Sequence, residues 1–450
     1  MNDHFTLFEL PEPIDNIDKE SIHRAKPRLN VARRNQIEFK IASLDDLVPQ
    51  DHTVRLVWDY VNQLDMSNIL GTIQSVEGGV GRPATDPKIL LALWLYATLE
   101  GIVSARVITD YCSEHLAYQW ICGDVKINNH TLSDFSVKYG QQFDEFLIQS
   151  VAILIKQGSV DLEEVSQDGM RVRASAGDSS FRREKSLLAC HEEARQYLEK
   201  LRKELKDNPA ANRSKKEAAA LRAAKEREKR VKNALEELKK LEEEKKKNSH
   251  KGAKKLKEIL ANARASITDP EARKMKMACG GFRPAYNIQF ATTKKGRAII
   301  GVNIINRGND NGSILSMIEK THKDYGITPS RWLVDCGYAD YQEISRVAEL
   351  YKGCKIYMPP KMSRIPTDPH KILPTDTVGI IELRHRMNTD EAKHIYKGRG
   401  STAEFSNAQC RNKGLQQFFV RGLRRIKAVT IRFALTHNMQ RFFGMKMITV

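Results

Sequence analysis

The chain has 450 residues, of which 41% are hydrophobic, and a formal net charge of +18. This length predicts two to four domains with a sizeable core, and the composition excludes a disordered protein. The charge favours a polyanionic partner, with nucleic acid ahead of an anionic membrane surface, although a basic protein without such a partner stays an alternative.

The cysteines and the apolar segments indicate a cytoplasmic protein. The seven cysteines are scattered and form no C-x-x-C pair, so neither a disulfide framework nor a zinc site is expected. The first fifteen residues carry no secretory pattern. The longest apolar run, Ile89–Thr98, is too short to span a bilayer, and we expect no membrane partner.

Residues 1–50 are interrupted by prolines and predict a basic N-terminal arm. Residues 51–159 predict a helical domain. It has an amphipathic helix over His52–Asp65, a strongly apolar helix after Pro87, two short helices near residues 104–121, and a long helix over Phe135–Lys156. Such a domain binds DNA in the helix-turn-helix manner or serves packing and dimerisation, and the sequence leaves both open.

The remaining chain predicts a catalytic domain interrupted by an insertion. Residues 160–179 begin with an alternating strand that ends at Asp168-Gly169. Residues 180–277 carry leucines at helical spacing amid dense charge, which indicates a coiled-coil insertion or simply solvated helices. Residues 278–443 predict a hairpin around Lys294–Gly296, then alternating helices and strands. The expected fold class is α/β, with an RNase H-like mixed sheet and an all-α N-terminal domain.

Candidate metal ligands are acids at the ends of strands. Asp168 and Asp335 each follow a predicted strand and precede a glycine turn, although aspartate also caps turns without any catalytic role. Glu404 is the third candidate, and Tyr396, Arg399 and Arg411 are spaced to share a helical face with it, where the arginines would contact a phosphate or orient the acid. A solvated surface glutamate is the plainer interpretation of Glu404.

These motifs together resemble a bacterial insertion-sequence transposase of the DDE branch with a Tyr-Arg-Glu-Lys signature. VSQDGMRVRA and LVDCGYAD resemble its two aspartate motifs, and YKGRGSTAEF with a later arginine resembles the signature. GRPATDPKILLALWLYATLEG resembles its leading helical domain. Two departures concern the signature: Arg411 stands in place of lysine, and four residues instead of three separate Arg399 from Glu404. Glu382 and Glu391 are weaker alternatives for the third acid.

The resemblance implies binding to terminal inverted repeats, hydrolytic nicking, and joining of 3′-hydroxyl ends to target DNA. It implies Mg²⁺, or Mn²⁺ in its place, held by Asp168, Asp335 and Glu404, with two ions serving the attacking and leaving oxygens. The expected partner is double-stranded DNA, bound by a homodimer in the nucleoid. Three rivals stay open: an end-binding protein that does not cut, another RNase H-like nuclease, and a scaffold built on the coiled coil.

Overall fold

The computed structural model describes residues 41–76, 78, 82–207, 215–247, 253–360 and 368–446. Two compact units are present, Met1–Ser43 and Leu44–Val450, and everything below concerns the second. Most of the predicted N-terminal arm, residues 1–40, lies outside the described residues. No helix of the described chain has the length and apolar character needed to cross a membrane.

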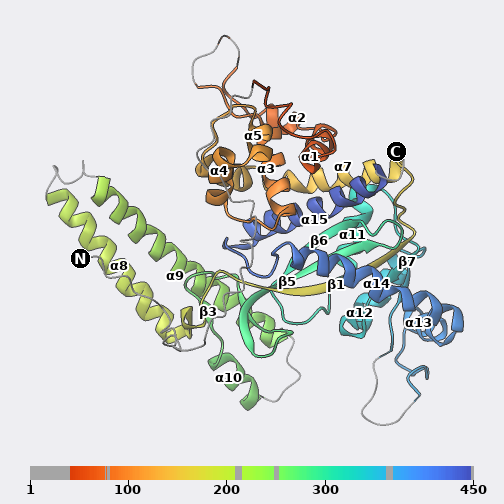
Figure 1. Ribbon diagram of the computed structural model, residues 1–450. Helices are drawn as coiled ribbons and strands as arrows, with labels where there is room; N and C mark the ends of the chain where they lie inside the picture. Colours follow the sequence, from red (N-terminus) through yellow and green to blue (C-terminus); the bar gives the residue numbers. More distant parts are fainter. Residues whose placement is uncertain are drawn as a thin grey trace, which may run out of the picture. The chain divides into compact units, whose positions relative to one another are not determined.

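Among the described residues, seven helices precede the first strand, and several of them are labelled in Figure 1. They are α1 (Thr53–Asn62), α2 (Ser67–Leu70), α3 (Pro87–Leu99), α4 (Ala105–Glu114), α5 (Leu116–Cys122), α6 (Asn129–Lys138) and α7 (Phe143–Lys156). Helix α3 begins as predicted, with Pro87 in its first turn and Asp86 accepting a hydrogen bond from the Lys88 amide. Its residues are buried on nearly all sides, which makes α3 the centre of this helical part.

The prediction of one long helix over Phe135–Lys156 is wrong. Helix α6 begins earlier, because the Asn128 side chain accepts a hydrogen bond from the Thr131 amide. It ends before Gly140, and α7 begins afresh at Phe143. A Cβ atom at Gly140 would lie 2.7 Å from the Cβ of Ala428. The glycine therefore separates the two helices and allows close approach to the C-terminal helix.

The sheet contains six strands, β1 (Glu164–Arg173), β4 (Arg273–Lys276), β5 (Phe282–Thr293), β6 (Ile299–Ile305), β7 (Arg331–Leu333) and β8 (Lys355–Tyr357). Their order is β4-β5-β1-β7-β8, and β6 also pairs with β5. Strand β1 is antiparallel to β5 and parallel to β7. The predicted turn at Asp168-Gly169 is wrong, since β1 continues to Arg173 and keeps its pairing with β5 beyond the glycine. The β5–β6 hairpin turns at Gly296, where φ is +73°, as its residues predicted.

Five helices follow β6, namely α11 (Ile314–Tyr325), α12 (Tyr341–Leu350), α13 (Val378–Asn388), α14 (Asp390–Asn412) and α15 (Leu423–Lys446). Successive residues of β5 contribute to two separate cores, since Phe290 packs with α15 and Ala291 packs with α11. Helix α14 contacts β1 and β5. The sheet is thus covered on both faces by helices, which leaves its strand ends as sites for polar side chains.

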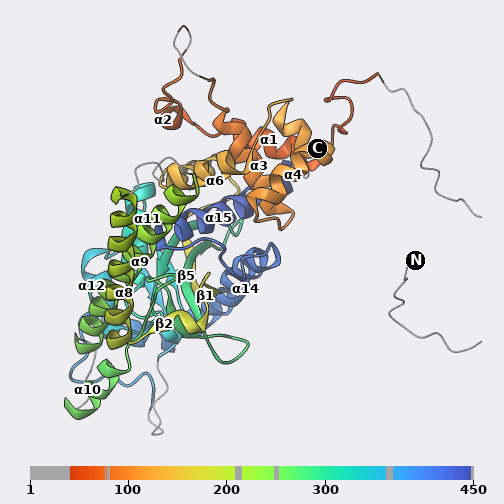
Figure 2. The same cartoon turned by 90° about the vertical axis from the view of Figure 1, so that its left-hand side faces the viewer.

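The predicted insertion consists of two long helices, α8 (Glu184–Asp207) and α9 (Lys215–Lys247), followed by α10 (Ala253–Ala261). Helices α8 and α9 pack side by side, as both views show (Figures 1 and 2). At their base, β2 (Phe181–Arg182) pairs antiparallel with β3 (Ala265–Ser266). The insertion therefore leaves and re-enters the main fold at one place, between β1 and β4.

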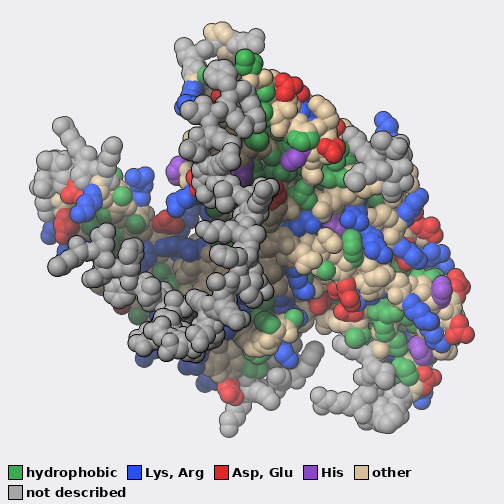
Figure 3. All heavy atoms as spheres, viewed as in Figure 1, with side chains coloured by type: hydrophobic (Ala, Val, Ile, Leu, Met, Phe, Trp, Pro, Cys, Tyr) green, Lys and Arg blue, Asp and Glu red, His purple; other side chains and the backbone are tan. Residues whose placement is uncertain are grey.

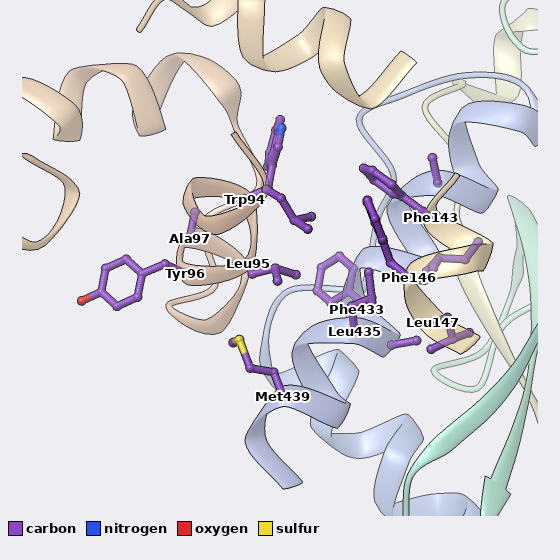
Figure 4. Packing of buried hydrophobic residues seen from close by; sticks show 14 of the residues in the cluster. Trp94, Leu95, Tyr96, Ala97, Phe143, Phe146, Leu147, Phe433, Leu435 and Met439 are labelled. Carbon is purple, nitrogen blue, oxygen red and sulfur yellow. The ribbon is translucent and has the colours of Figure 1, made fainter. Parts of the chain in front are cut away.

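One hydrophobic core joins the N-terminal helices to the sheet. It includes Trp94 and Leu95 of α3, Phe143 and Phe146 of α7, and Phe433 of α15 (Figure 4). The same cluster extends to Phe290 on β5 and to Ile299 on β6. Because α15 packs against α3, α7 and β6, it fixes the helical part onto the sheet.

Candidate functional site

Two of the predicted acids meet where β7 ends beside β1. The last paired residues of these parallel strands are Ser166 and Leu333, so Asp168 and Asp335 both lie two residues further along. Asp335 begins a short 3₁₀ turn, Cys336–Tyr338, in which its carboxylate accepts a hydrogen bond from the Gly337 amide at 2.7 Å. Asp335 just beyond the end of β7 and Asp168 within β1 are therefore brought to one point by the parallel pairing of the two strands.

Helix α14 supplies two polar partners to Asp168. The Arg399 guanidinium donates to Asp168 Oδ1 at 2.9 Å and lies 3.5 Å from Asp335 Oδ2. The Asn407 amide nitrogen donates to Asp168 Oδ2 at 2.8 Å. Two turns of one helix separate these residues, so both face the same carboxylate. The sequence analysis placed Arg399 beside Glu404, but the structure pairs it with Asp168, and Asn407 is a partner that the sequence analysis missed.

A third aspartate, Asp310, reaches the site from the loop between β6 and α11. Its Oδ1 accepts hydrogen bonds from the amides of Asn287 and Gln289, both at 2.7 Å. Gly169 makes room for it, because a Cβ atom at this position would lie 2.5 Å from the same oxygen. The loop RGNDNGS has the composition of a turn, and this is why its acid was not distinguished from a turn residue.

The three aspartates line a common cavity of about 700 Å³, with Arg411 on its wall. Asp168 faces α14 and Gly169 faces the opposite side of β1, because successive strand residues alternate. Strand β7 ends before it reaches the position beside Asp168, so side chains from both faces of the sheet can line the cavity. This arrangement gathers carboxylates and guanidinium groups around one space that is open to a ligand.

The crowding of acids perturbs the ionisation of Asp168. Burial raises the pKa of Asp168 to about 6, against the opposing charge of Arg399, and the charges of Asp335 and Asp310 add to the rise. Burial works to lower the pKa of Arg399, but Asp168 and Asp335 outweigh it and the pKa is raised. Arg399 therefore does not fully offset the cost of ionising the buried carboxylate of Asp168.

Beneath the aspartates lies a network of buried polar side chains. The Gln289 side-chain oxygen accepts hydrogen bonds from the Tyr338 hydroxyl and, at 3.1 Å, from the Gln167 amide. The Trp332 indole donates to Gln167 at 3.1 Å. The network fixes the amide group of Gln289 that donates to Asp310, so the position of that acid is set by the core of the sheet.

The remaining predicted residues lie on α13 and α14. Tyr396 is half-buried, and burial raises the pKa of its hydroxyl to about 12. Glu404 is exposed and does not line the cavity of the aspartates. Glu404 precedes Asn407 by three residues, which corresponds to about 60° around the helix axis. It precedes Arg411 by seven residues, which corresponds to about 20°. Glu404 therefore lies on the side of α14 that borders the cavity. The weaker alternatives, Glu382 and Glu391, are not among the cavity residues.

Hard oxygen donors predominate at this site. Asp168, Asp335 and Asp310 offer carboxylates, and the Asn407 side-chain oxygen is buried without a hydrogen-bond partner. Within the described ranges, no group of three or more His, Cys, Asp or Glu side chains is already arranged closely enough to hold a metal ion. The donor types suit magnesium or manganese, and Arg399 occupies part of the space between the first two acids.

Comparison with known proteins gives one family match. Residues 42–138, which include α1 to α6, match the family model described as Transposase domain (DUF772). No curated protein and no solved structure matches the chain. The helical part thus matches the transposase domain of this family, and this match supports an insertion-sequence transposase.

Proposed function

We propose that the chain is a DDE transposase that cuts DNA at the ends of an insertion sequence and joins the freed 3′-hydroxyl groups to target DNA. The observation that carries this proposal is the convergence of Asp168 and Asp335 from adjacent parallel strands onto one arginine. The match of residues 42–138 to a transposase domain supports the same activity.

The strand order supports an RNase H-like catalytic domain. In chain order the main strands are β1, β5, β6, β7 and β8, and in space they run β6-β5-β1-β7-β8. Only β5 is antiparallel to both of its neighbours, and β7 and β8 extend the sheet in parallel. An open sheet of this kind places functional groups where its central parallel strands stop pairing, and Asp168 and Asp335 both lie two residues beyond the last β1–β7 pair.

The residues of the site fit a divalent cation. Burial, with the charges of Asp335 and Asp310, raises the pKa of Asp168, and an added cation would favour the ionised carboxylate. Asp168, Asp335 and a third acid would hold Mg²⁺ or Mn²⁺. Such ions, when bound, polarise a phosphodiester and lower the pKa of an attacking water or hydroxyl group. Movement of Arg399 away from Asp335 would open the position between the two acids.

The cations of α14 would serve the DNA. Arg411 lines the cavity without an ion pair to any described carboxylate, so its guanidinium is available to a phosphate. Arg399 pairs with Asp168 and can move to the same phosphate when a metal ion takes over that carboxylate. Tyr396, one turn before Arg399, keeps a neutral hydroxyl that can donate to a phosphate oxygen.

Two residues compete for the position of third acid. Glu404 matches the motif order and lies on α14, the helix that contacts Asp168, although it does not line the cavity. Asp310 already lines the cavity with both aspartates. We retain Glu404 as the third acid, because it can turn toward Asp168 without breaking a described hydrogen bond. Asp310 instead accepts two amide hydrogen bonds that hold it toward β5.

The face shown in Figure 3 carries Lys and Arg side chains interspersed with Asp and Glu, so positive charge is spread over it. The net charge of +18 would favour binding of double-stranded DNA through its phosphates. We further propose that the protein acts as a homodimer in the bacterial cytoplasm, since two transposon ends are cut in one event.

The test is cleavage of a plasmid that carries the element's ends, with Mg²⁺ or Mn²⁺. Alanine at Asp168 or Asp335 is expected to abolish cleavage while DNA binding is kept. Glu404→Gln is expected to abolish cleavage as well, whereas Asp310→Asn is expected to reduce it less. Glu391→Gln, at an exposed position at the start of the same helix, is the matched control. Cleavage that persists in the Asp168 or Asp335 variant would contradict the proposal.

A further inference from the structure

A second cavity of about 610 Å³ lies between the transposase domain and the C-terminal helix. Helices α3, α4, α6 and α15 and the chain just before α15 form its walls. Its lining combines apolar side chains, such as Trp94, Val103 and Phe419, with three arginines, Arg106, Arg425 and Arg432. None of the described residues that line it is acidic. We call it the Arg432 cavity.

Arg432 is a buried cation that forms no ion pair with a described acidic side chain. Only 2% of the residue is exposed, and its Nε atom has no hydrogen-bond partner. No carboxylate among the described residues forms an ion pair with it, and its guanidinium stacks on the Trp94 ring at 3.9 Å. Burial lowers the pKa of Arg432 to about 9, so the side chain still carries its charge at neutral pH.

Other polar groups in the Arg432 cavity also lack partners. The Ser136 hydroxyl is buried and forms no hydrogen bond. Helix α4 begins at the wall of the cavity with Ser104 as its N-cap, and no side chain accepts a hydrogen bond from its first turn. A helix N-terminus, a hydroxyl and a guanidinium all favour a negatively charged oxygen.

An unpaired charge in the interior is costly, and a bound anion would remove most of that cost. Arg432 stands on α15, which packs against the helical part and against β6, and an apolar side chain would pack more favourably at this position. A cation is explained here if a ligand supplies the missing negative charge. The apolar walls and the exposed Phe419 ring, 69% accessible, offer a surface for a planar group beside that charge.

We propose that the Arg432 cavity binds a phosphate of a DNA strand, with the neighbouring base against Phe419. This inference rests on the proposed function. The cavity of the aspartates is lined by Gln416, and the Arg432 cavity is lined by Phe419, three residues later in the same segment. Three residues span at most about 11 Å. A strand rises about 3.4 Å per nucleotide, so the adjoining walls of the two cavities lie about three nucleotides or less apart.

The test measures binding of a DNA oligonucleotide carrying the element's end to the full chain in EDTA, so that cleavage is not required. Arg432→Met replaces the cation with an apolar side chain of similar length. It is expected to weaken binding about tenfold, the usual effect of losing a hydrogen bond to a charged group. Its unfolding midpoint without DNA should equal or exceed that of the parent protein, because an unpaired buried charge has been removed.

Arg441→Met is the matched control. Arg441 lies on the same helix, stacks on Phe405 at 5.1 Å, and has a buried Nε without a partner, but it does not line the cavity. It should bind the oligonucleotide as the parent does. If Arg432→Met does not fold, Arg106→Ala and Arg425→Ala test the same cavity, since both side chains are exposed.

Three outcomes decide the matter. Weaker oligonucleotide binding in the Arg432 variant, with the Arg441 variant unchanged, supports the proposal. Equal affinity in the two variants overturns it. Inorganic phosphate could raise the unfolding midpoint of the parent protein but not of Arg432→Met, while both proteins bind the oligonucleotide equally. That result would show a site for free anions and would overturn the assignment to DNA. Because no metal or cleavage is involved, failure of the proposed catalytic function leaves this test readable.

Discussion

Replacing Asp168 with asparagine should stabilise the metal-free protein at neutral pH. Asp168 has a pKa of about 6 in the folded chain, compared with about 3.9 for an aspartate in an unfolded chain. A raised folded-state pKa means that ionisation opposes folding. The cost is absent below about pH 4, grows as the pH rises through 6, and is complete above that. Two pKa units correspond to about 3 kcal/mol.

The site can accept the new amide with little rearrangement. Its oxygen can receive the hydrogen bond from Arg399 that Asp168 Oδ1 now accepts. Its NH₂ group can donate to the Asn407 oxygen, which has no partner at present, once the Asn407 amide turns over. The substitution therefore removes the charge and keeps both contacts, so that most of the roughly 3 kcal/mol should be recovered.

Urea unfolding of both proteins in EDTA at pH 7.5 and pH 4.5 measures the effect. At pH 7.5, Asp168→Asn should raise the free energy of unfolding by up to about 3 kcal/mol, and at pH 4.5 by much less. Added Mg²⁺ should raise the midpoint of the parent protein and leave the variant unchanged, since the ion favours the ionised carboxylate. A variant that is less stable at pH 7.5, or a gain independent of pH, would refute the reasoning about crowded acids.

Two further substitutions probe the geometry of the site. Gly169→Ala should abolish cleavage and lower the free energy of unfolding by about 1–3 kcal/mol, because the added methyl group would press on Asp310. Unchanged urea midpoints and an unchanged cleavage rate would show that the loop carrying Asp310 moves aside without cost. Arg399→Lys should reduce cleavage about tenfold or more with little change in unfolding, because a lysine cannot pair bidentately with the phosphate that Arg399 would contact once a metal ion is bound. Plasmid cleavage rates under saturating Mg²⁺ provide the measurement, and a parent-like rate would dismiss this role of Arg399.

The sequence indicated the helices and strands better than their ends. Pro87 and the turn at Gly296 were recognised because their backbone chemistry is local. The end of β1 was misplaced, because the Asp-Gly pair at Asp168 is stabilised as a strand by β5, which lies more than 100 residues later. The break at Gly140 was also missed, since it depends on contact with Ala428 in a distant helix.

The site was predicted in part for a similar reason. Asp168, Asp335 and Arg399, which the structure brings together, could be singled out because an Asp-Gly pair, a strand end and the motif order mark them. Asp310 and Asn407 could not, because the first stands in a polar loop and the second carries no charge. Their roles arise only from pairing across the sheet and from the packing of α14, which no local pattern records.

The short β2–β3 ladder affects how the chain can reach this fold. Gln167 and Gln289 meet across β1 and β5 although 122 positions separate them in the sequence. When α8 and α9 fold against each other and β2 pairs with β3, the loop still to be closed shrinks to roughly 40 residues. That shortening lowers the entropic cost of closure by about 1 kcal/mol. The insertion thus brings the two central strands together during folding, whatever it binds afterwards.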